Sequence, residues 1–432
     1  MYCIPFSHRN GLWVTAGKDM TMLNDLFELS RHLARILERP YRRQSLHARV
    51  FKSRCSILVG QRGIGKTTAV VQYLRETFPD YVTSRACLYL PVDHFVVAQR
   101  PLYEIARDFV NQGGKLLCLN EIHKQGDWAR SLKSIYDTFP ELHVVASGSS
   151  MLQIHKGSHD LSRRAIVHRL SGLSFREYLE LTLNLKLPVH TIDAVLEHHE
   201  TLASESVAHL KEKNAKVLAL FHDYLQVGFY PYFSEYQDID LFKITLEQNV
   251  HTAIESDLTA LHPSLSGSSV ARIKRLLAVI AASVPFTPDW ARLRRLLDIA
   301  DDRTLKTYVN HLENAGLIMT ISRAAGGVRA MEKPEKIYLG DPNQIYALCT
   351  PAQAHIGNVR ETFFCRMMSE VASIHAAERG DFIIKKDVLI EVGGRSKTEH
   401  QIRGHSSAFL ALDDIEVGVD RKIPLWLFGF LY

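Results

Sequence analysis

The residues best suited to do chemistry form one glycine-rich stretch early in the chain. The stretch fits the pattern G-x-x-x-x-G-K-[ST] at every fixed position. Glycines let the chain curl so that successive backbone N–H groups point at an anion, and a helix that follows adds the positive end of its dipole. The pattern therefore predicts a loop that holds the phosphates of a nucleoside triphosphate, formed by Gly60, Gln61, Arg62, Gly63, Ile64, Gly65, Lys66, Thr67 and Thr68.

Two side chains at the end of this loop have defined roles in phosphate chemistry. We expect the ammonium of Lys66 to reach the β- and γ-phosphates and the hydroxyl of Thr67 to ligate Mg²⁺. The apolar run Ser56–Val59 predicts a buried strand before the loop, and the residues from Thr68 onward predict a helix after it. This strand–loop–helix order supports the prediction of a phosphate-binding loop.

A second pair of polar residues follows the apolar run Leu116–Leu119, which predicts another strand. A site of this kind needs an acid that holds Mg²⁺ through water and a second acid that activates the attacking water. Glu121 fits the second role. Asn120 stands in the first position, where its neutral amide orients a metal-bound water without the attraction of a charge. Two outcomes stay open: slower hydrolysis, or binding without useful hydrolysis.

Hydroxyl and arginine side chains later in the chain are candidates for the same site. In the segment Ser147–Ser150, after a fourth apolar run, Ser149 is predicted to sense the γ-phosphate; a plain serine-rich turn is the alternative. Arg163 and Arg164 are predicted to stabilise phosphate charge in a neighbouring subunit, as an arginine finger does. A surface ion pair is an equal alternative for these arginines.

The elements that position these residues alternate between short apolar runs and helical stretches, which indicates an α/β fold with a parallel sheet. An amphipathic helix over residues 20–40, ended by Pro40, precedes the sheet. We expect an N-terminal helical segment over 1–45 and a P-loop ATPase domain over 46–180. The second strand is expected at the sheet edge. The predicted strands are Ser56–Val59, Cys87–Pro91, Leu116–Leu119, Leu142–Ala146 and Ala165–Leu170.

Residues 181–269 predict a helical connector or lid that ends in a linker, Ser264–Ser269. Residues 270–330 have the order of a winged helix, with helices predicted at Ala271–Val284, Asp289–Asp298 and Asp302–Asn314 and a strand after them. Between residues 270 and 310 there are eight basic and four acidic residues, which is compatible with DNA phosphates. DNA is therefore one expected partner, and protein contact or domain packing is the alternative.

Residues 331–432 predict a small α/β domain whose layout resembles restriction-endonuclease-like folds. Strands are predicted at Asp381–Ile384 and Val388–Val392, a helix at Lys397–Arg403, and a last buried strand in the apolar tail. Asp381, Glu391 and Glu361 are residues that can hold a cation. The position two residues after Glu391, where a lysine would help to activate water, is Gly393. Arg395 or Lys397 can replace that lysine only if the loop folds back. We expect an inactive remnant used for binding or packing, with a nuclease as the alternative.

Several motifs together resemble prokaryotic AAA-superfamily ATPases that carry a C-terminal domain of uncertain function. The motifs are Gly60–Thr68, Leu119–Lys124, Ser147–Ser150, Leu161–Ala165, Leu173–Tyr178, Arg360–Phe364, Glu391–Gly394 and Ile423–Gly429. The resemblance implies an ATPase fold with ATP as the ligand. The family usually carries Asp-Glu where this chain has Asn120 and Glu121.

Composition sets broader limits. The net charge of +5 allows nucleic-acid contact, and the six scattered cysteines predict neither a disulfide framework nor a zinc site. The longest apolar run, Ile423–Tyr432, is too short to cross a bilayer, and a cytoplasmic protein is expected. The leading hypothesis is an ATPase whose nucleotide state moves the winged helix and the C-terminal domain. The alternatives are a non-hydrolysing ATP-gated switch for a protein partner and a DNA nuclease acting through Asp381 and Glu391. The expected partners also include a second copy of the chain in a homo-oligomer.

Overall fold

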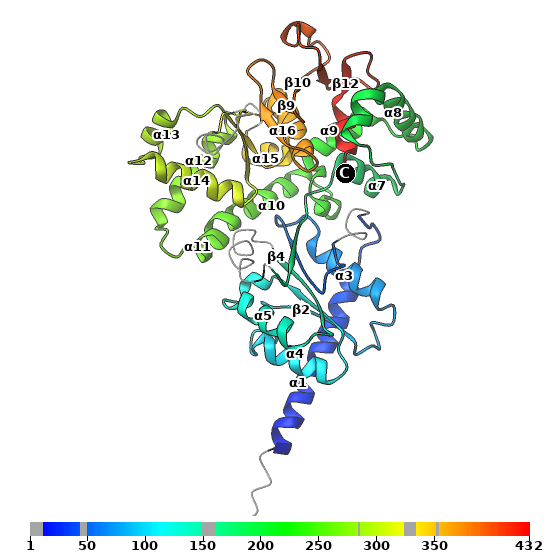
Figure 1. Ribbon diagram of the computed structural model, residues 1–432, viewed down its shortest axis with the longest axis vertical. Coiled ribbons are helices and arrows are strands. Elements are labelled where there is room, and N and C mark those ends of the chain that lie inside the picture. Colours follow the sequence, from blue (N-terminus) through cyan, green and yellow to red (C-terminus); the bar gives the residue numbers. More distant parts are fainter. Residues whose placement is uncertain are drawn as a thin grey trace, which may run out of the picture. The chain divides into compact units, whose positions relative to one another are not determined.

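A computed structural model describes residues 12–43, 50–148, 161, 163–283, 286–323, 334–350 and 354–432 (Figure 1). By their contacts these residues form two compact units. Of the described residues, those up to 60, 66–148 and those from 161 to 170 belong to the first unit, and 61–65 and those from 171 onward belong to the second. Within the described residues, no helix is both long enough and apolar enough to span a bilayer.

The first unit is built on a five-stranded sheet with the order β2-β3-β4-β1-β5 and parallel pairing throughout. This confirms the predicted α/β fold, including the place of β2 at the sheet edge. The strands are β1 (Cys55–Val59), β2 (Cys87–Pro91), β3 (Leu116–Asn120), β4 (His143–Gly148) and β5 (Ile166–Arg169). The helices are α1 (Leu12–Ile36), α3 (Lys66–Thr77), α4 (Leu102–Asn111), α5 (Trp128–Thr138) and the 3₁₀ turn η1 (Ile122–Lys124).

The strands coincide with the apolar runs of the sequence. Helices cover both faces of a parallel sheet, so the side chains of a strand are buried on both sides and must be apolar. All residues of β1 and β3 are buried. Helix α1 covers the β2 edge, where the backbone N–H of Tyr89 donates to the hydroxyl of Ser30 over 2.8 Å. Helix α1 ends at Ile36, a few residues before the predicted stop at Pro40.

The second unit begins with helices and short irregular turns. A capping box starts α7: the Ser174 hydroxyl accepts from the backbone N–H of Glu177, and the Glu177 carboxylate accepts from that of Ser174. The α-helices are α7 (Phe175–Leu183), α8 (Ile192–Glu212), α9 (Val217–Asp223), α10 (Ile239–Thr252) and α11 (Leu258–Leu261). The turns are the π-helical η3 (Tyr224–Gly228) and η5 (Ala253–Asp257) and the 3₁₀ turn η4 (Pro231–Glu235).

The helices predicted for residues 270–314 are present. They are α12 (Gly267–Ala281), α13 (Trp290–Leu297) and α14 (Asp302–Asn314). After them, β6 (Ile318–Ile321) pairs antiparallel with β7 (Lys336–Leu339). The predicted linker Ser264–Ser269 is shorter than expected, because the Ser266 hydroxyl caps α12 by accepting from the N–H of Ser269. The assignment of this region as a winged helix stays a prediction.

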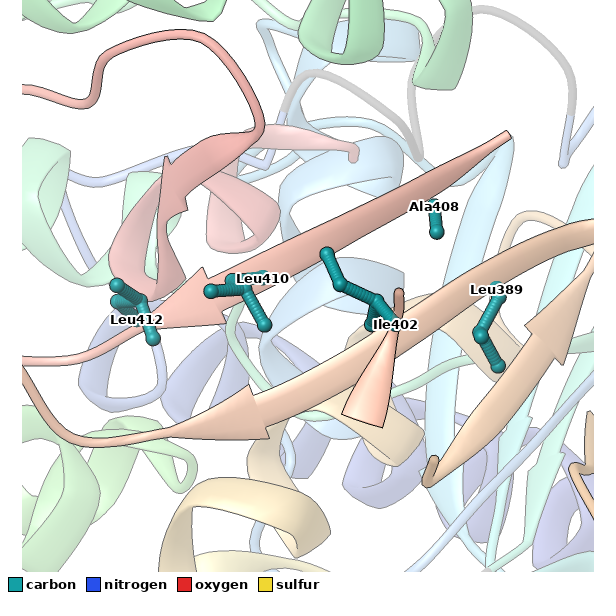
Figure 2. Close-up of a cluster of buried hydrophobic side chains, with 5 residues drawn as sticks. All are labelled: Leu389, Ile402, Ala408, Leu410 and Leu412. Atoms are coloured by element: carbon teal, nitrogen blue, oxygen red, sulfur yellow. The ribbon is translucent and has the colours of Figure 1, made fainter. Parts of the chain in front are cut away.

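The C-terminal part holds a second five-stranded sheet, ordered β12-β11-β10-β9-β8. Strands β8, β9 and β10 pair antiparallel, whereas β10, β11 and β12 pair parallel. The strands are β8 (Ile374–Ala376), β9 (Phe382–Ile384), β10 (Val388–Gly393), β11 (Ala408–Leu412) and β12 (Lys422–Pro424), and the helices are α15 (Pro342–Leu348) and α16 (Ile356–Ser369). A small core on this sheet joins Leu389, Ile402, Ala408, Leu410 and Leu412 (Figure 2).

Two predictions about the C-terminal part are wrong. The helix expected at Lys397–Arg403 is a loop with one 3₁₀ turn, η7 (Glu399–Gln401), because Ile402 is drawn into the core under the sheet (Figure 2). The apolar tail is buried but is not a long strand. Pro424 ends β12, since proline has no N–H for the next ladder bond, and the chain continues as the 3₁₀ helix η8 (Leu425–Phe430).

Candidate nucleotide-binding site

The glycine-rich loop joins the end of β1 to the start of α3, as the sequence predicts. Gly63 and Gly65 have φ angles of 80° and 94°, in the left-handed region that side chains other than glycine rarely adopt. Helix α3 begins at Lys66, so its first backbone N–H groups have no acceptor within the helix and lie at the positive end of its dipole, where an anion is favoured. The loop therefore has the backbone form of a phosphate-binding loop.

The side chain of Lys66 is buried and folds back across the loop. Its ammonium donates a hydrogen bond of 2.9 Å to the carbonyl of Gly60. A buried cation at this place gives the loop a positive charge beside the start of α3, where the helix dipole has the same sign. Both effects favour a bound anion.

Three side chains converge where β3 and β4 end beside the loop. The carbonyl oxygen of Asn120, the last residue of β3, accepts a hydrogen bond of 3.1 Å from the Thr67 hydroxyl and one of 2.6 Å from the Ser147 hydroxyl. Ser147 and Asn120 are both buried. The predicted neighbours Thr67 and Asn120 thus lie together. Ligands of parallel α/β sheets bind beyond these carboxyl ends of the strands.

The structure describes one serine of the segment Ser147–Ser150 at the site, and the predicted role of Ser149 stays a prediction. Ser147, inside β4, reaches Asn120, whereas Ser149 lies outside the described residues. The signal that could have identified Ser147 is a polar residue at a fully buried strand position, next to the strand that carries the loop.

Glu121 follows β3 directly and has a left-handed backbone, with φ of 56°. A non-glycine residue in this region is uncommon and costs of the order of 1 kcal/mol. Its carboxylate lies 3.5 Å from the imidazole Nε2 of the buried His123. The sharp turn places the carboxylate just beyond the strand end, where the sequence predicts the group that activates water.

The arginine that follows the serine-rich segment has a partner within the first unit. Arg164 forms two hydrogen bonds, of 2.7 and 2.9 Å, with the carboxylate of Asp137 at the end of α5. Both side chains are exposed enough for solvent to screen the pair. This pair corresponds to the surface ion pair that sequence analysis gave as one of two alternatives for Arg164. An arginine-finger role for Arg163 or Arg164 stays a prediction.

The tip of the loop, Gln61–Gly65, belongs by its contacts to the second unit. Arg62 forms an ion pair of 3.1 Å with the buried carboxylate of Asp257. Gln61 donates from its side-chain amide to the carbonyl of Gly316, just before β6. A side chain at Gly63 would overlap the ring of Tyr232. Sequence analysis did not predict these partners, since the Arg62–Asp257 pair joins residues 195 positions apart.

The acidic residues predicted for the C-terminal domain also come together. The carboxylates of Glu361, Asp381 and Glu391 lie around the ammonium groups of Lys336 and Lys397. The loop after β10 does fold back and brings Lys397 onto Glu391, which is the condition that the sequence set for a replacement lysine.

Comparison with known families assigns the first unit. Residues 52–179 match the family described as AAA domain, and residues 218–350 match a domain of unknown function, DUF8612. The AAA match spans β1 to β5 and the whole loop. The chain has an AAA-type P-loop ATPase domain.

A search of curated proteins finds the uncharacterized protein MJ1637 of Methanocaldococcus jannaschii, which is 26% identical over 409 residues, or 86% of this chain and 82% of the relative. Among solved structures, the Walker-type ATPase PABY2304 of Pyrococcus abyssi has 12% identity and a TM-score of 0.36 over 69% of this chain and 91% of its own. The AMPPCP-bound DnaA of Aquifex aeolicus has 15% identity and a TM-score of 0.23, over 71% and 89%. At these scores neither structure adds to the assignment.

Proposed function

We propose that this chain binds and hydrolyses ATP with Mg²⁺, and that its nucleotide state controls a winged helix over residues 270–330 and the C-terminal domain. The main support is the placement of Lys66 and Thr67 at the start of α3, with Thr67 hydrogen-bonded to Asn120 at the end of β3. A loop that binds phosphate here puts the γ-phosphate beside the residues that follow β3.

Each residue then has one task. Lys66 exchanges its bond to Gly60 for phosphate oxygens, and Asn120 orients a water molecule through its amide. Glu121 accepts the proton of the water that attacks the γ-phosphorus, the bond to the β-phosphate oxygen breaks, and ADP and phosphate result. Bound Mg²⁺ neutralises charge on the phosphates. The Thr67 hydroxyl and the Asn120 amide would hold such an ion, because Mg²⁺ prefers oxygen ligands. These two oxygens are uncharged, and the negative phosphates would balance the charge of the ion.

The coupling to residues 270–330 is supported by the loop tip. Gln61 bonds to Gly316, which lies in the predicted winged helix, and Arg62 pairs with Asp257 in the turn η5. A nucleotide that reshapes the loop tip would disturb both contacts. Because the Asp257 carboxylate is buried, the loss of its ion pair with Arg62 would be costly and would favour a rearrangement.

The test measures the affinity of the full-length protein for a fluorescent ATP analogue, together with its ATPase rate. Lys66→Ala should weaken binding by at least about tenfold, since it removes charge-assisted hydrogen bonds to phosphate. Lys52→Ala, which removes an exposed lysine near β1, is the matched control and should bind as the wild type does. Equal affinity in Lys66→Ala would refute the proposed loop.

A second candidate function is an ATP-gated switch that binds without turnover. The observation in its favour is the neutral Asn120, whose carbonyl oxygen already accepts from two hydroxyls. Tight binding of the ATP analogue with no ATPase activity, with or without duplex DNA, would favour the switch.

A further inference from the structure

The network that holds the tip of the phosphate-binding loop contains a tyrosine hydroxyl with two acceptors. Gln61, Tyr230 and Asp341 all belong to the second unit by their contacts. The Tyr230 hydroxyl lies 3.1 Å from the side-chain oxygen of Gln61 and 2.7 Å from a carboxylate oxygen of Asp341. A phenol carries a single proton, so Tyr230 can donate to only one of these oxygens at a time. The two bonds are therefore alternatives.

The side-chain amide of Gln61 is held at its other end by the main chain. Its N–H donates to the carbonyl of Gly316. Gly340 leaves the room that this carbonyl needs, because a Cβ on Gly340 would overlap the Gly316 oxygen. When Tyr230 also donates to Gln61, both ends of the amide are fixed. The tip of the loop can then move only if both bonds break.

Asp341 is a completely buried carboxyl group at the start of α15. One of its oxygens caps the helix by accepting from the backbone N–H of Gln344, and the other accepts over 2.8 Å from the Gln344 side-chain amide. When Asp341 is charged it is the stronger acceptor for Tyr230, because hydrogen bonds to an ionised group are shorter and stronger. When Asp341 is protonated it can donate to the Tyr230 oxygen, and the phenol proton is then available to Gln61.

The proton that selects between the two arrangements is that of Asp341. Burial raises the pKa of Asp341 to about 6, and the hydrogen bonds that it accepts and the charge of Arg366 lower it by less. Arg366 of α16 keeps its own charge, as guanidinium groups do in proteins. Burial raises the pKa values of the tyrosines that face Asp341, so these stay neutral; they are Tyr224 of η3, Tyr230, and Tyr232 of η4.

We propose that Tyr230 is a positioning residue for the nucleotide site: it holds the loop tip through Gln61 when Asp341 is protonated and releases it when Asp341 is charged. This role rests on the proposed function, in which the nucleotide reshapes the loop tip. A tip that is held opposes that change, so protonation of Asp341 lowers the affinity for ATP. Because linkage is reciprocal, bound ATP favours the charged form of Asp341 and expels its proton.

The first test compares the affinity of full-length wild type and Tyr230→Phe for the fluorescent ATP analogue. Both proteins are measured at the same pH, so the titration of the phosphates cancels. Their affinities should agree at about pH 8, whereas at about pH 5.5 Tyr230→Phe should bind about fivefold more tightly, as expected for the loss of one opposing hydrogen bond. Tyr224→Phe is the matched control, since it removes a buried phenol that donates to Leu173, and it should tighten binding at no pH. A gain in affinity is not what damage to the fold produces.

Asp341→Asn should fix the held arrangement at every pH. Its oxygen still caps α15, and its amide donates to Tyr230. The side-chain oxygen of Gln344, which has no hydrogen-bond partner among the described residues, can accept the second N–H once the Gln344 amide turns. The variant should bind the ATP analogue about fivefold more weakly than the wild type at about pH 8 and match it at about pH 5.5. Adding Tyr230→Phe should abolish this effect. If Asp341→Asn does not fold, Tyr230→Phe decides.

Proton release is measured by titration calorimetry of ATP binding at about pH 6, in two buffers of different ionisation enthalpy. The wild type should release more protons per bound ATP than Tyr230→Phe does, by up to about one. Equal affinities of wild type and Tyr230→Phe at every pH, or weaker binding by Tyr230→Phe, would overturn the role of Tyr230. Lys66→Ala separates this failure from that of the nucleotide site. If Lys66→Ala loses affinity while Tyr230→Phe changes nothing, only the role of Tyr230 falls, and if Lys66→Ala binds as the wild type does, both fall.

Discussion

At the scale of single residues, Asn120 is the position on which the proposed ATP turnover depends most. Its carbonyl oxygen accepts from Thr67 and Ser147, and a carboxylate oxygen in the same place can accept both bonds. The substitution Asn120→Asp therefore changes the charge of the site and conserves its geometry. A carboxylate attracts a cation and its bound water through its negative charge, and the neutral amide of Asn120 does not.

We expect Asn120→Asp to raise the ATPase rate at saturating Mg²⁺ by at least about tenfold, since added charge close to the cation is worth more than 1.4 kcal/mol. Steady-state phosphate release measures it. Asn120→Ala, which leaves both hydroxyls without their acceptor, is the control and should be slower than the wild type. An unchanged rate in Asn120→Asp would mean that the amide does not limit hydrolysis.

Glu121 should act on turnover and not on binding. Glu121→Gln keeps the size of the side chain but removes the base, so the ATPase rate should fall by about 10²- to 10⁴-fold with the ATP affinity unchanged. Rapid-quench measurement of a single turnover separates the two. A fall in affinity as large as the fall in rate would show that Glu121 has a role in binding instead.

At the scale of elements, the start of α7 joins two distant parts of the second unit. The buried Ser174 hydroxyl caps the helix and also donates over 2.8 Å to the main-chain oxygen of Tyr432, next to η8. Loss of a cap costs about 1 kcal/mol. The Tyr432 oxygen would keep its second donor, Nε of Arg176 at 3.0 Å, so the loss of the Ser174 bond adds less than a fully unpaired acceptor would.

Ser174→Ala should therefore lower the free energy of unfolding of the second unit by about 1 kcal/mol, most of it from the lost cap. Urea unfolding followed by tryptophan fluorescence is a suitable measurement, because Trp426 lies in η8. Ser204→Ala removes an exposed serine from inside α8 and serves as the control. Equal losses in the two variants would contradict the role of Ser174 as a link.

Helix α14 should make stability depend on pH through His311. Burial, and then the nearby His262, lower the pKa of His311 to about 4. The unfolded chain binds this proton near pH 6.5 and the folded chain does not, so stability should fall as the pH drops from about 6.5 to about 4. Because the side chain is only partly buried, we expect a loss of only about 1 kcal/mol. Unfolding midpoints across this range should vary less in His311→Gln.

The elements that could be predicted from sequence are those set by local pattern. Leu116–Leu119 is an apolar run because a central parallel strand is buried on both faces, and α14 begins at a capping aspartate. The elements that could not be predicted depend on distant contacts. The segment around Ile402 was expected to be a helix but forms a loop, because Ile402 packs into the hydrophobic core formed with strands β10 and β11. The apolar tail could not be assigned either, since a short apolar run is compatible with both a strand and a helix.

The nucleotide site divides in the same way. Lys66, Thr67 and Asn120 could be assigned because motif spacing and strand ends fix their positions. The contact of Ser147 with Asn120 was not predicted, since a shift of one or two residues along a strand end is below the precision of a sequence pattern. Asp257 could not be found, because no local signal marks a carboxylate that pairs with Arg62 from far along the chain.

At the scale of the whole molecule, the proposal that nucleotide controls a winged helix makes DNA a partner to test. Helix α14 exposes Arg303, Thr307 and Asn310, which share one face of the helix. These side-chain types contact phosphates and base edges. We expect Arg303→Ala to weaken duplex-DNA binding and to reduce its salt dependence, measured by fluorescence anisotropy.

Arg130→Ala, which removes a solvent-exposed arginine of α5, is the control and should bind DNA as the wild type does. DNA affinity that is unchanged in Arg303→Ala would direct the search to protein partners of this helix.

The hydrogen bond from Tyr89 to Ser30 has a practical consequence for any shortened form of the protein. Strand β2 is the sheet edge, and α1 supplies the acceptor that keeps one of its backbone donors from solvent. A fragment that starts after α1 would present this edge and the apolar surface beneath Leu23, Leu26 and Phe27. Bare strand edges recruit strands of other molecules, so such a fragment should self-associate, and it would be a misleading substitute for the intact protein in measurements of oligomeric state.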